Sequence, residues 1–86
     1  MCTYVVEKTK IAGSGKGAGG WFELTEAHVT YDHPHHALYD HTLNIDFVNE
    51  AQGAGARVAV ELTAESAQAL AEKILAALEV GRREHG

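Results

Sequence analysis

The sequence predicts an α+β domain in which a four-stranded antiparallel sheet is followed by one C-terminal helix packed on one face of that sheet. Three observations lead to this fold class. Four segments between residues 2 and 63 are rich in β-branched and aromatic residues and alternate between apolar and polar side chains. Glycine-rich stretches interrupt this pattern. Beyond residue 63 the apolar spacing changes from two residues to three and four, which is the period of a helix.

The first predicted strand, CTYVVEKTKI, spans residues 2–11 and is followed by the segment AGSGKGAGG. Glycine opposes helix and strand interiors because it loses more backbone entropy than other residues, so we expect a flexible loop here. The loop formally contains G-x-G-x-x-G at Gly15, Gly17 and Gly20. That pattern binds dinucleotides where it joins a strand to a helix, whereas a strand pattern follows here. We therefore expect a hairpin loop or a substrate cover rather than a phosphate site.

The second predicted strand, WFELTEAHVTYD, spans residues 21–32, and its alternation breaks near Glu26, where we expect a β-bulge. HTLNIDFVN at residues 41–49 gives the clearest alternation, with Leu43, Ile45 and Phe47 on one face. EAQGAGA predicts a turn, and RVAVELT at residues 57–63 alternates again. The last two strands are therefore predicted to form an antiparallel hairpin.

The C-terminal segment predicts a helix that begins after Thr63, a residue type favoured as an N-cap. Apolar residues at helical spacing form one stripe: Ala67, Leu70, Ala71, Ile74, Ala77 and Leu78. Gly81 is predicted to end the helix. Glu65 in the first turn and two arginines after the glycine suit the helix dipole.

The chain length predicts one domain, spanning residues 1–86. A chain this short buries only about 60–65% of its unfolded surface, so it needs a disulfide, a metal or a partner subunit to supplement its core. Cys2 is the single cysteine, which excludes an internal disulfide. One helix also covers only part of a four-stranded sheet. We therefore predict a homodimer that covers the remaining face or extends the sheet edge to edge.

Charge and composition narrow the class of partner. The formal net charge is −5, and the seven lysines and arginines are scattered along the chain. Nucleic acid and anionic membranes are therefore disfavoured as partners, because both require a basic surface. No leader pattern or long apolar run is evident, and cysteine is scarce. These features predict a soluble protein in the reducing cytoplasm. The partners that we expect are a second copy of the chain and a small-molecule substrate.

Four of the six histidines lie within residues 33–41, in the segment HPHHALYDH. Neutral imidazole is the commonest biological ligand for transition metals, and a site for Zn, Ni, Cu or Fe needs about three convergent nitrogens. His33 and His36 lie three residues apart in the predicted loop, and His41 lies on the apolar face of the strand that follows. We therefore predict His33, His36 and His41 as the ligands of a divalent transition metal.

Neighbouring side chains have supporting roles in this hypothesis. Asp32 and Asp40 are candidate ligands or hydrogen-bond acceptors that hold the imidazole rings in one tautomer. His28 is a further candidate from the neighbouring strand. The alternatives are acid/base or hydrogen-bonding use of the histidines, or a solvated loop without a ligand. The spacing matches no standard motif, so it does not identify the metal.

Three functions are compatible with these features. In the first, the protein is a small metalloenzyme whose ion activates water or polarises a carbonyl, with Asp40, Tyr31 or Glu26 carrying the proton and the glycine loop as a cover. This version requires an apolar pocket and an open coordination position. In the second, it is a non-enzymatic metal or ligand binding module, which requires no pocket. In the third, the histidines are unliganded and the dimer surface is the function.

Several motifs also resemble a small bacterial family that is catalogued as a domain of unknown function. They are MCTYVVEK, KGAGGWF, DHP with HA, HTLNIDF and RVAVELTAESA, which together extend over nearly the whole chain. The resemblance implies a stand-alone cytoplasmic protein, and it implies no activity, cofactor or catalytic residue. The family pattern includes the positions of His33, His36 and His41, which agrees with the ligands proposed above.

Overall fold

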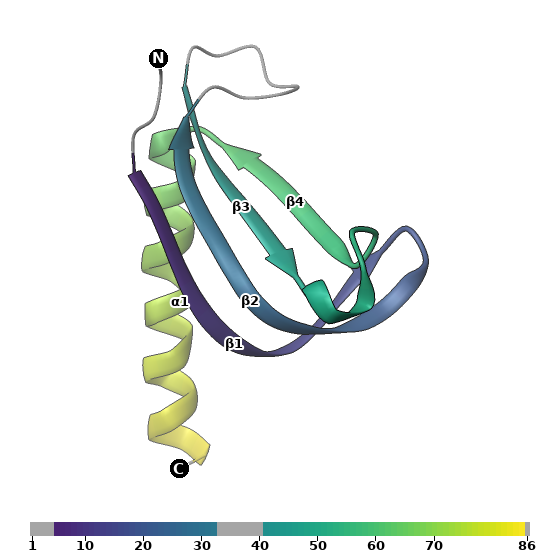
Figure 1. Ribbon diagram of the computed structural model, residues 1–86. Coiled ribbons are helices and arrows are strands. Elements are labelled where there is room, and N and C mark those ends of the chain that lie inside the picture. The colour runs from purple at the N-terminus through teal and green to yellow at the C-terminus, as the bar shows by residue number, and fades with distance from the viewer. Residues whose placement is uncertain (1–4, 33–40, 86) are drawn as a thin grey trace.

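The computed structural model describes residues 5–32 and 41–85. Five main elements and one short 3-10 helix follow in order (Figure 1): β1 (Val5–Gly17), β2 (Gly20–Asp32), β3 (Thr42–Val48), η1 (Glu50–Gln52), β4 (Arg57–Leu62) and α1 (Ala64–His85). Each strand pairs antiparallel with the next, in the order β1-β2-β3-β4. The predicted α+β fold, a four-stranded antiparallel sheet followed by one helix, is confirmed.

The glycine segment is mostly strand rather than the predicted flexible loop. β1 continues to Gly17, which pairs with Gly20 across a two-residue turn. The glycines make room for bulky side chains of β2. A Cβ on Gly15 would lie 3.2 Å from the Leu24 side chain, and one on Gly17 would lie 3.1 Å from the Phe22 ring. The entropic cost of these glycines is therefore offset by close packing across the hairpin.

A β-bulge bends this hairpin. The register between β1 and β2 shifts between Lys10 and Gly13, opposite Thr25. The irregularity lies beside Glu26 as expected, but its extra residue is in β1 and not in β2. Bulges increase the local twist, and the end of the hairpin curls across toward β4 (Figure 1). There, a Cβ on Gly17 would lie 3.4 Å from the carbonyl oxygen of Arg57. The sheet is therefore strongly coiled at this end.

The strand register separates two faces of the sheet. Cross-strand partners point to the same side, and three sets of them form what we call the apolar face: Ala27, Phe47 and Val58; Val29, Ile45 and Val60; Tyr31, Leu43 and Leu62. The opposite side, which we call the polar face, carries Lys8, His28 and Asp46 in one row. Among the described apolar residues the buried core is small, consisting of Leu24, Ala27 and Val48. Most of the apolar face is only half-buried.

Helix α1 begins where the sequence predicts. The Thr63 hydroxyl accepts a hydrogen bond from the Ser66 amide at 3.1 Å, which confirms the predicted N-cap. The predicted end at Gly81 is wrong, because the helix continues to His85. Gly81 does not adopt a positive φ. A single interior glycine costs only about 1 kcal/mol, and no proline follows to stop the helix. Within the described residues, no helix combines the length and apolar character needed to cross a membrane.

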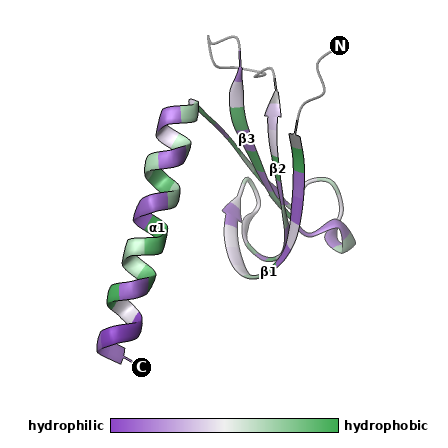
Figure 2. Ribbon diagram, turned by 90° about the vertical axis from the view of Figure 1, so that its left-hand side faces the viewer, coloured by the Kyte–Doolittle hydropathy of each residue, from purple (hydrophilic) through white to green (hydrophobic). Residues whose placement is uncertain are grey.

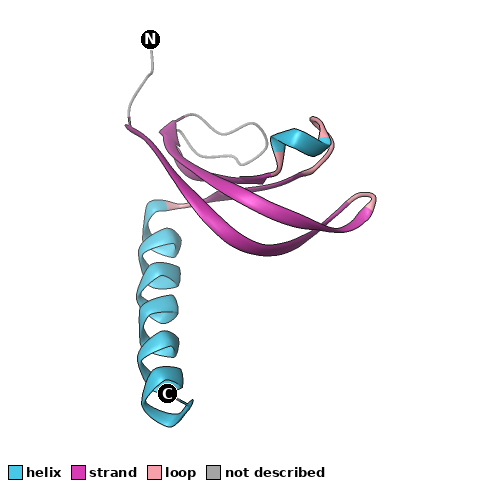
Figure 3. Ribbon diagram, turned by 60° about the horizontal axis from the view of Figure 1, so that its bottom comes forward, coloured by secondary structure: helices cyan, strands magenta, loops and turns pink. Residues whose placement is uncertain are grey.

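The helix extends away from the sheet instead of lying over the apolar face (Figures 2 and 3). Its main contacts are with β3 and β4, and none of its residues is buried. Thr63 alone separates β4 from α1. A helix that covers a sheet must step roughly 10 Å out of the sheet plane, and one residue spans at most about 3.6 Å. The short connection therefore leaves the apolar face open in a single chain.

Candidate metal site on the polar face

The structure describes one of the three predicted ligands. His33 and His36 lie outside the described residues, as does Asp40. His41 is half-buried just before β3, and its ring stacks on the ring of Tyr31, with centroids 5.8 Å apart and an interplanar angle of 13°. Stacking involves the faces of the imidazole, whereas metal coordination uses lone pairs in the ring plane. His41 is therefore placed at the end of the apolar face, where its ring packs on Tyr31.

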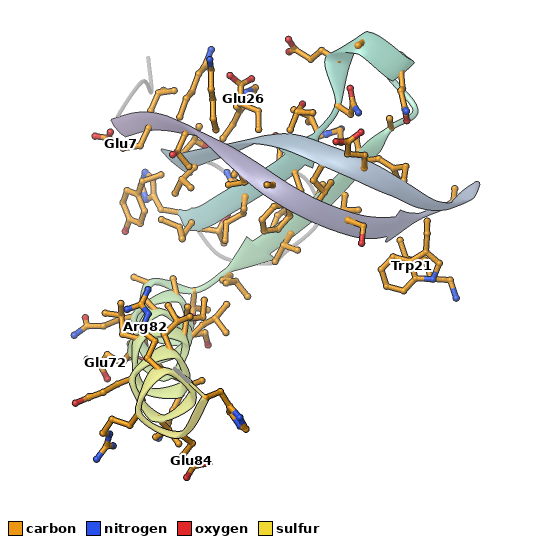
Figure 4. The ribbon with its side chains drawn as sticks, turned by 90° about the horizontal axis from the view of Figure 1, so that it is seen from below. Glu7, Trp21, Glu26, Glu72, Arg82 and Glu84 are labelled. Carbon is orange, nitrogen blue, oxygen red and sulfur yellow. The ribbon has the colours of Figure 1, made fainter. Side chains whose placement is uncertain are left out.

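A second set of ligand-type side chains converges on the polar face. Glu26 and His28 of β2 and Glu50 of η1 each offer one ligand atom, and these atoms all lie within 4.8 Å of one another. Glu26 and His28 are two residues apart in a strand, so they share a face. Glu26 pairs with Val48, and Glu50 follows two residues later. Figure 4 shows Glu26 on the side of the sheet away from α1.

Buried hydrogen bonds hold the Glu50 turn against β2. The Asn49 side chain, only 5% exposed, donates to the Glu23 carbonyl oxygen at 3.0 Å. The Asn49 amide donates to the Ala56 carbonyl oxygen at 3.1 Å. Thr25 also donates its hydroxyl to the Val48 carbonyl oxygen at 3.3 Å. The Asn49–Glu23 and Thr25–Val48 bonds connect the end of β3 and the start of η1 to β2, whereas the Asn49–Ala56 bond closes the turn. The backbone therefore places Glu50 beside Glu26.

Glu26 and His28 form a direct pair, with 2.8 Å between Glu26 Oε1 and His28 Nε2. Their side chains are 33% and 19% exposed, respectively. The pKa of Glu26 lies below its ordinary value of 4.5, chiefly because His28 donates a hydrogen bond to the carboxylate. Partial burial opposes this shift, while the charges of His28, Lys8 and Lys10 add to it. Glu26 is therefore a carboxylate near neutral pH and is available as an anionic ligand.

The geometry of this cluster suits a single cation. Two ligand atoms bonded to the same ion at about 2.1 Å can be at most about 4.2 Å apart. The ligand atoms of the cluster, all within 4.8 Å of one another, are therefore close to a coordinating arrangement. The arrangement would present one imidazole nitrogen and two carboxylate oxygens to the ion.

Sequence reasoning named part of this cluster but did not assemble it. The sequence offers Glu26 as one of three alternative proton carriers and His28 as a further candidate ligand, whereas the segment that contains Glu50 predicts only a turn. The E-x-H spacing in β2 is the signal that places two of the residues on one face. Glu50 joins them through the path of η1, which the strand pattern does not encode.

Three surface hollows of about 200, 350 and 270 Å³ are lined by described residues. The first lies at the hairpin turn beside Trp21 and Phe22, and the last lies along α1. The largest is on the apolar face, beside Leu24, Phe47 and Val58. The residues of the Glu26 cluster line none of these three hollows. Within the cluster, Glu26 and His28 are half-buried and Glu50 is exposed.

The fold and this cluster define a small α+β domain with a candidate site for a cation. A family model described as "Family of unknown function (DUF6295)" matches residues 1–86, and the chain belongs to this family. The match covers the same extent as the motif resemblance found in the sequence. No curated protein and no solved structure matches the chain significantly.

The Glu26–His28 pair predicts that the free energy of unfolding decreases at acidic pH. The folded-state pKa of Glu26 is lower than its ordinary value of 4.5 in an unfolded chain. The ionised carboxylate therefore stabilises the fold above that value, and this contribution is lost as the pH falls through the folded-state pKa. Between about pH 6 and pH 3, the wild-type chain should lose more free energy of unfolding than Glu26→Gln.

Urea titrations at each pH measure this difference, with Glu79→Gln on α1 as the matched control. Parallel profiles for wild type and Glu26→Gln would contradict the pair's role.

Proposed function

We propose that this protein is a small cytoplasmic metal-binding protein, acting as a homodimer, that holds one divalent transition metal ion with Glu26, His28 and Glu50. The main support for this proposal is that the ligand atoms of these three residues all lie within 4.8 Å of one another. The proposal also rests on the buried anchoring of Glu50 through its neighbour Asn49 and on the ionised state of Glu26. Imidazole and carboxylate together form a common ligand set for zinc and related ions.

The charges around the cluster favour a transition ion over Mg²⁺ or Ca²⁺. Lys8 pairs with His28 across the sheet, and Lys10 pairs with Glu26. Their positive charges offset part of the negative charge of the two carboxylates. Mg²⁺ and Ca²⁺ depend on oxygen ligands and on negative charge, whereas Zn, Ni, Cu and Fe gain affinity from an imidazole nitrogen. We therefore expect a transition metal from this second group.

The position of the cluster outside the three hollows described above favours binding over catalysis. Metal-assisted catalysis needs a shaped, water-excluding cavity beside the ion. The three hollows described above lie elsewhere, so the arrangement supports a module that stores, transfers or is stabilised by its metal. The metalloenzyme predicted from the sequence remains a hypothesis. It requires that the protein turns over a small-molecule substrate and that this turnover is lost when the ligands of the ion are substituted.

A second candidate ligand set is the predicted group of His33, His36 and His41. The observation that favours it is the position of His41, whose ring is held half-buried against Tyr31 at the start of β3. Three imidazoles would form a nitrogen-only site of the kind used by zinc enzymes. His41 follows the alternation of the apolar face and Glu26 belongs to the polar face. Separate substitutions can therefore test the two sets.

The test combines elemental analysis of the purified protein with calorimetric titration of Zn²⁺ and Ni²⁺. We expect one equivalent of metal per chain in the wild-type protein. Substitution of a residue that only orients a metal ligand lowers the affinity for the metal by about 10–100-fold. His28→Ala should therefore weaken binding by more than about 100-fold. His85→Ala, at the exposed end of α1, is the matched control and should bind as the wild type does.

Each result of this experiment assigns or removes a site. Loss of metal in His28→Ala and Glu50→Gln, with retention in the triple variant of His33, His36 and His41 to Ala, supports the cluster on the polar face. The reverse pattern supports the three-imidazole site and removes the Glu26 cluster. Absence of stoichiometric binding in the wild-type protein, after loading with each ion, removes the metal-binding function.

A further inference from the structure

Two large apolar surfaces are uncovered in the single chain. On the sheet, Val29, Ile45 and Val60 of the apolar face are only half-buried. On α1, the apolar stripe defined above exposes Leu70 at 46% and Ile74 at 51%. Figure 2 shows hydrophobic residues in both the helix and the strands, with the two elements apart. Exposed apolar surfaces of this kind mark interaction sites.

The overall dimensions of the chain show how much surface is available. Its accessible surface is 6541 Å². A compact monomer of this mass would expose about 4,900 Å², so the excess is about 1,600 Å². The radius of gyration is 14.5 Å, compared with about 12 Å for a compact domain of this length. Each partner in a standard stable interface buries about 800 Å². The uncovered area is therefore ample for a dimer.

The connection between β4 and α1 opposes packing of the helix on its own sheet. Thr63 is the whole connection between β4 and α1. Connections between a strand and a helix that packs on its sheet usually have about 2–6 residues. The helix also starts with its N-cap hydrogen bond formed at Thr63, which fixes its direction as it leaves the strand. In the structure the stripe of α1 is not buried on the apolar face of its own chain, and the short connection opposes such packing.

We propose that two copies of this chain exchange their C-terminal helices, so that the apolar stripe of α1 in each copy packs on the apolar face of its partner. In a dimer with a two-fold axis, the contact between the helix of one copy and the sheet of the other forms twice. The exchange covers both surfaces with one arrangement, whereas pairing of the two helices alone would leave both sheet faces open. Trp21, 71% exposed at the hairpin end, lies on the same side of the sheet as α1 (Figure 4). Exposed aromatic residues of this kind are enriched in interfaces.

This inference is independent of the proposed metal site. Glu26 projects from the opposite side of the sheet to α1 (Figure 4), so the helix exchange leaves the polar face accessible. Loss of metal binding and loss of the dimer can therefore be measured separately. A protein that binds no metal would still form the dimer, and a monomeric variant would keep the Glu26 cluster.

The test mixes two single-cysteine chains, both carrying Cys2→Ser. One chain carries Ile74→Cys in the stripe of α1, and the other carries a cysteine on the apolar face, in turn Val29→Cys, Leu43→Cys or Val60→Cys. Mild oxidation of the refolded mixture should give a covalent heterodimer with at least one of these partners. Ala76→Cys, on the opposite side of the helix, is the matched control and should give none. Circular dichroism verifies that each variant folds.

Sedimentation equilibrium of the unmodified chain provides the companion measurement. We expect a mass of two chains, each of 9.2 kDa. Ile74→Glu should raise the dissociation constant of the dimer by more than about 100-fold, because it buries an unpaired charge, whereas Ala76→Glu should leave it unchanged. Three results would overturn the proposal. They are a monomeric mass at all concentrations, no heterodimer with any sheet partner, or a covalent homodimer formed by Ile74→Cys alone, which indicates paired helices.

Discussion

Replacing Leu24 with alanine is expected to lower the free energy of unfolding by about 2–4 kcal/mol, the range for truncating a buried leucine. Leu24 is 9% exposed and packs against the backbone of Gly15 and beside Phe47 and Val58. A domain of this length has a total stability of about 4–13 kcal/mol. The loss would therefore remove a large share of the stability of the sheet.

Urea unfolding at one fixed protein concentration measures this effect, since the free energy of a dimer depends on concentration. Leu75→Ala is the matched control, because Leu75 is 67% exposed on α1. Its substitution should change the stability by less than about 0.5 kcal/mol. Equal losses for the two variants would show that the small core identified here does not hold the sheet together.

Binding of the metal is expected to stabilise the fold strongly. An ion that binds the folded chain but not the unfolded chain raises the free energy of unfolding. The increase is about 2.7 kcal/mol when the free ion is at one hundred times its dissociation constant. For a domain of this size, this corresponds to a rise in Tm of about 10–20 °C. Glu26 and His28 lie on β2 and Glu50 lies on η1, so the ion would link the central part of the sheet to the turn after β3.

Thermal unfolding followed by circular dichroism, with and without Zn²⁺, measures the rise in Tm. His28→Ala should lose the rise, and His85→Ala should keep it. A rise of equal size in His28→Ala would mean that the ion binds elsewhere on the chain. Chelation of the metal should return the wild-type protein to the Tm of its metal-free form.

The fold was largely predictable because each element has a local signal. The alternation at Leu43, Ile45 and Phe47 defines β3, and Thr63 marks the start of α1. Two features were missed because local patterns do not describe them. Gly15 and Gly17 belong to strand β1, where Leu24 and Phe22 occupy the space beside them. Gly81 stays helical because nothing after it opposes the helix.

The candidate site was less predictable than the fold. The clustering of His33, His36 and His41 along the sequence indicated a metal site in the loop, and the described residues do not test that set. Glu50 lies close to Glu26 and His28 because β2 pairs with β3 and because Asn49 forms hydrogen bonds beside it. Such contacts join residues more than 20 positions apart, so no local spacing reveals them.

The most direct test of the metal site is a Zn²⁺ titration of ¹⁵N-labelled protein in which NMR follows the imidazole nitrogens of each histidine. The ligand assignment predicts that the ring nitrogens of His28 shift and saturate at one equivalent, while those of His33, His36 and His41 stay unchanged. Unshifted His28 nitrogens in the presence of bound zinc would contradict it.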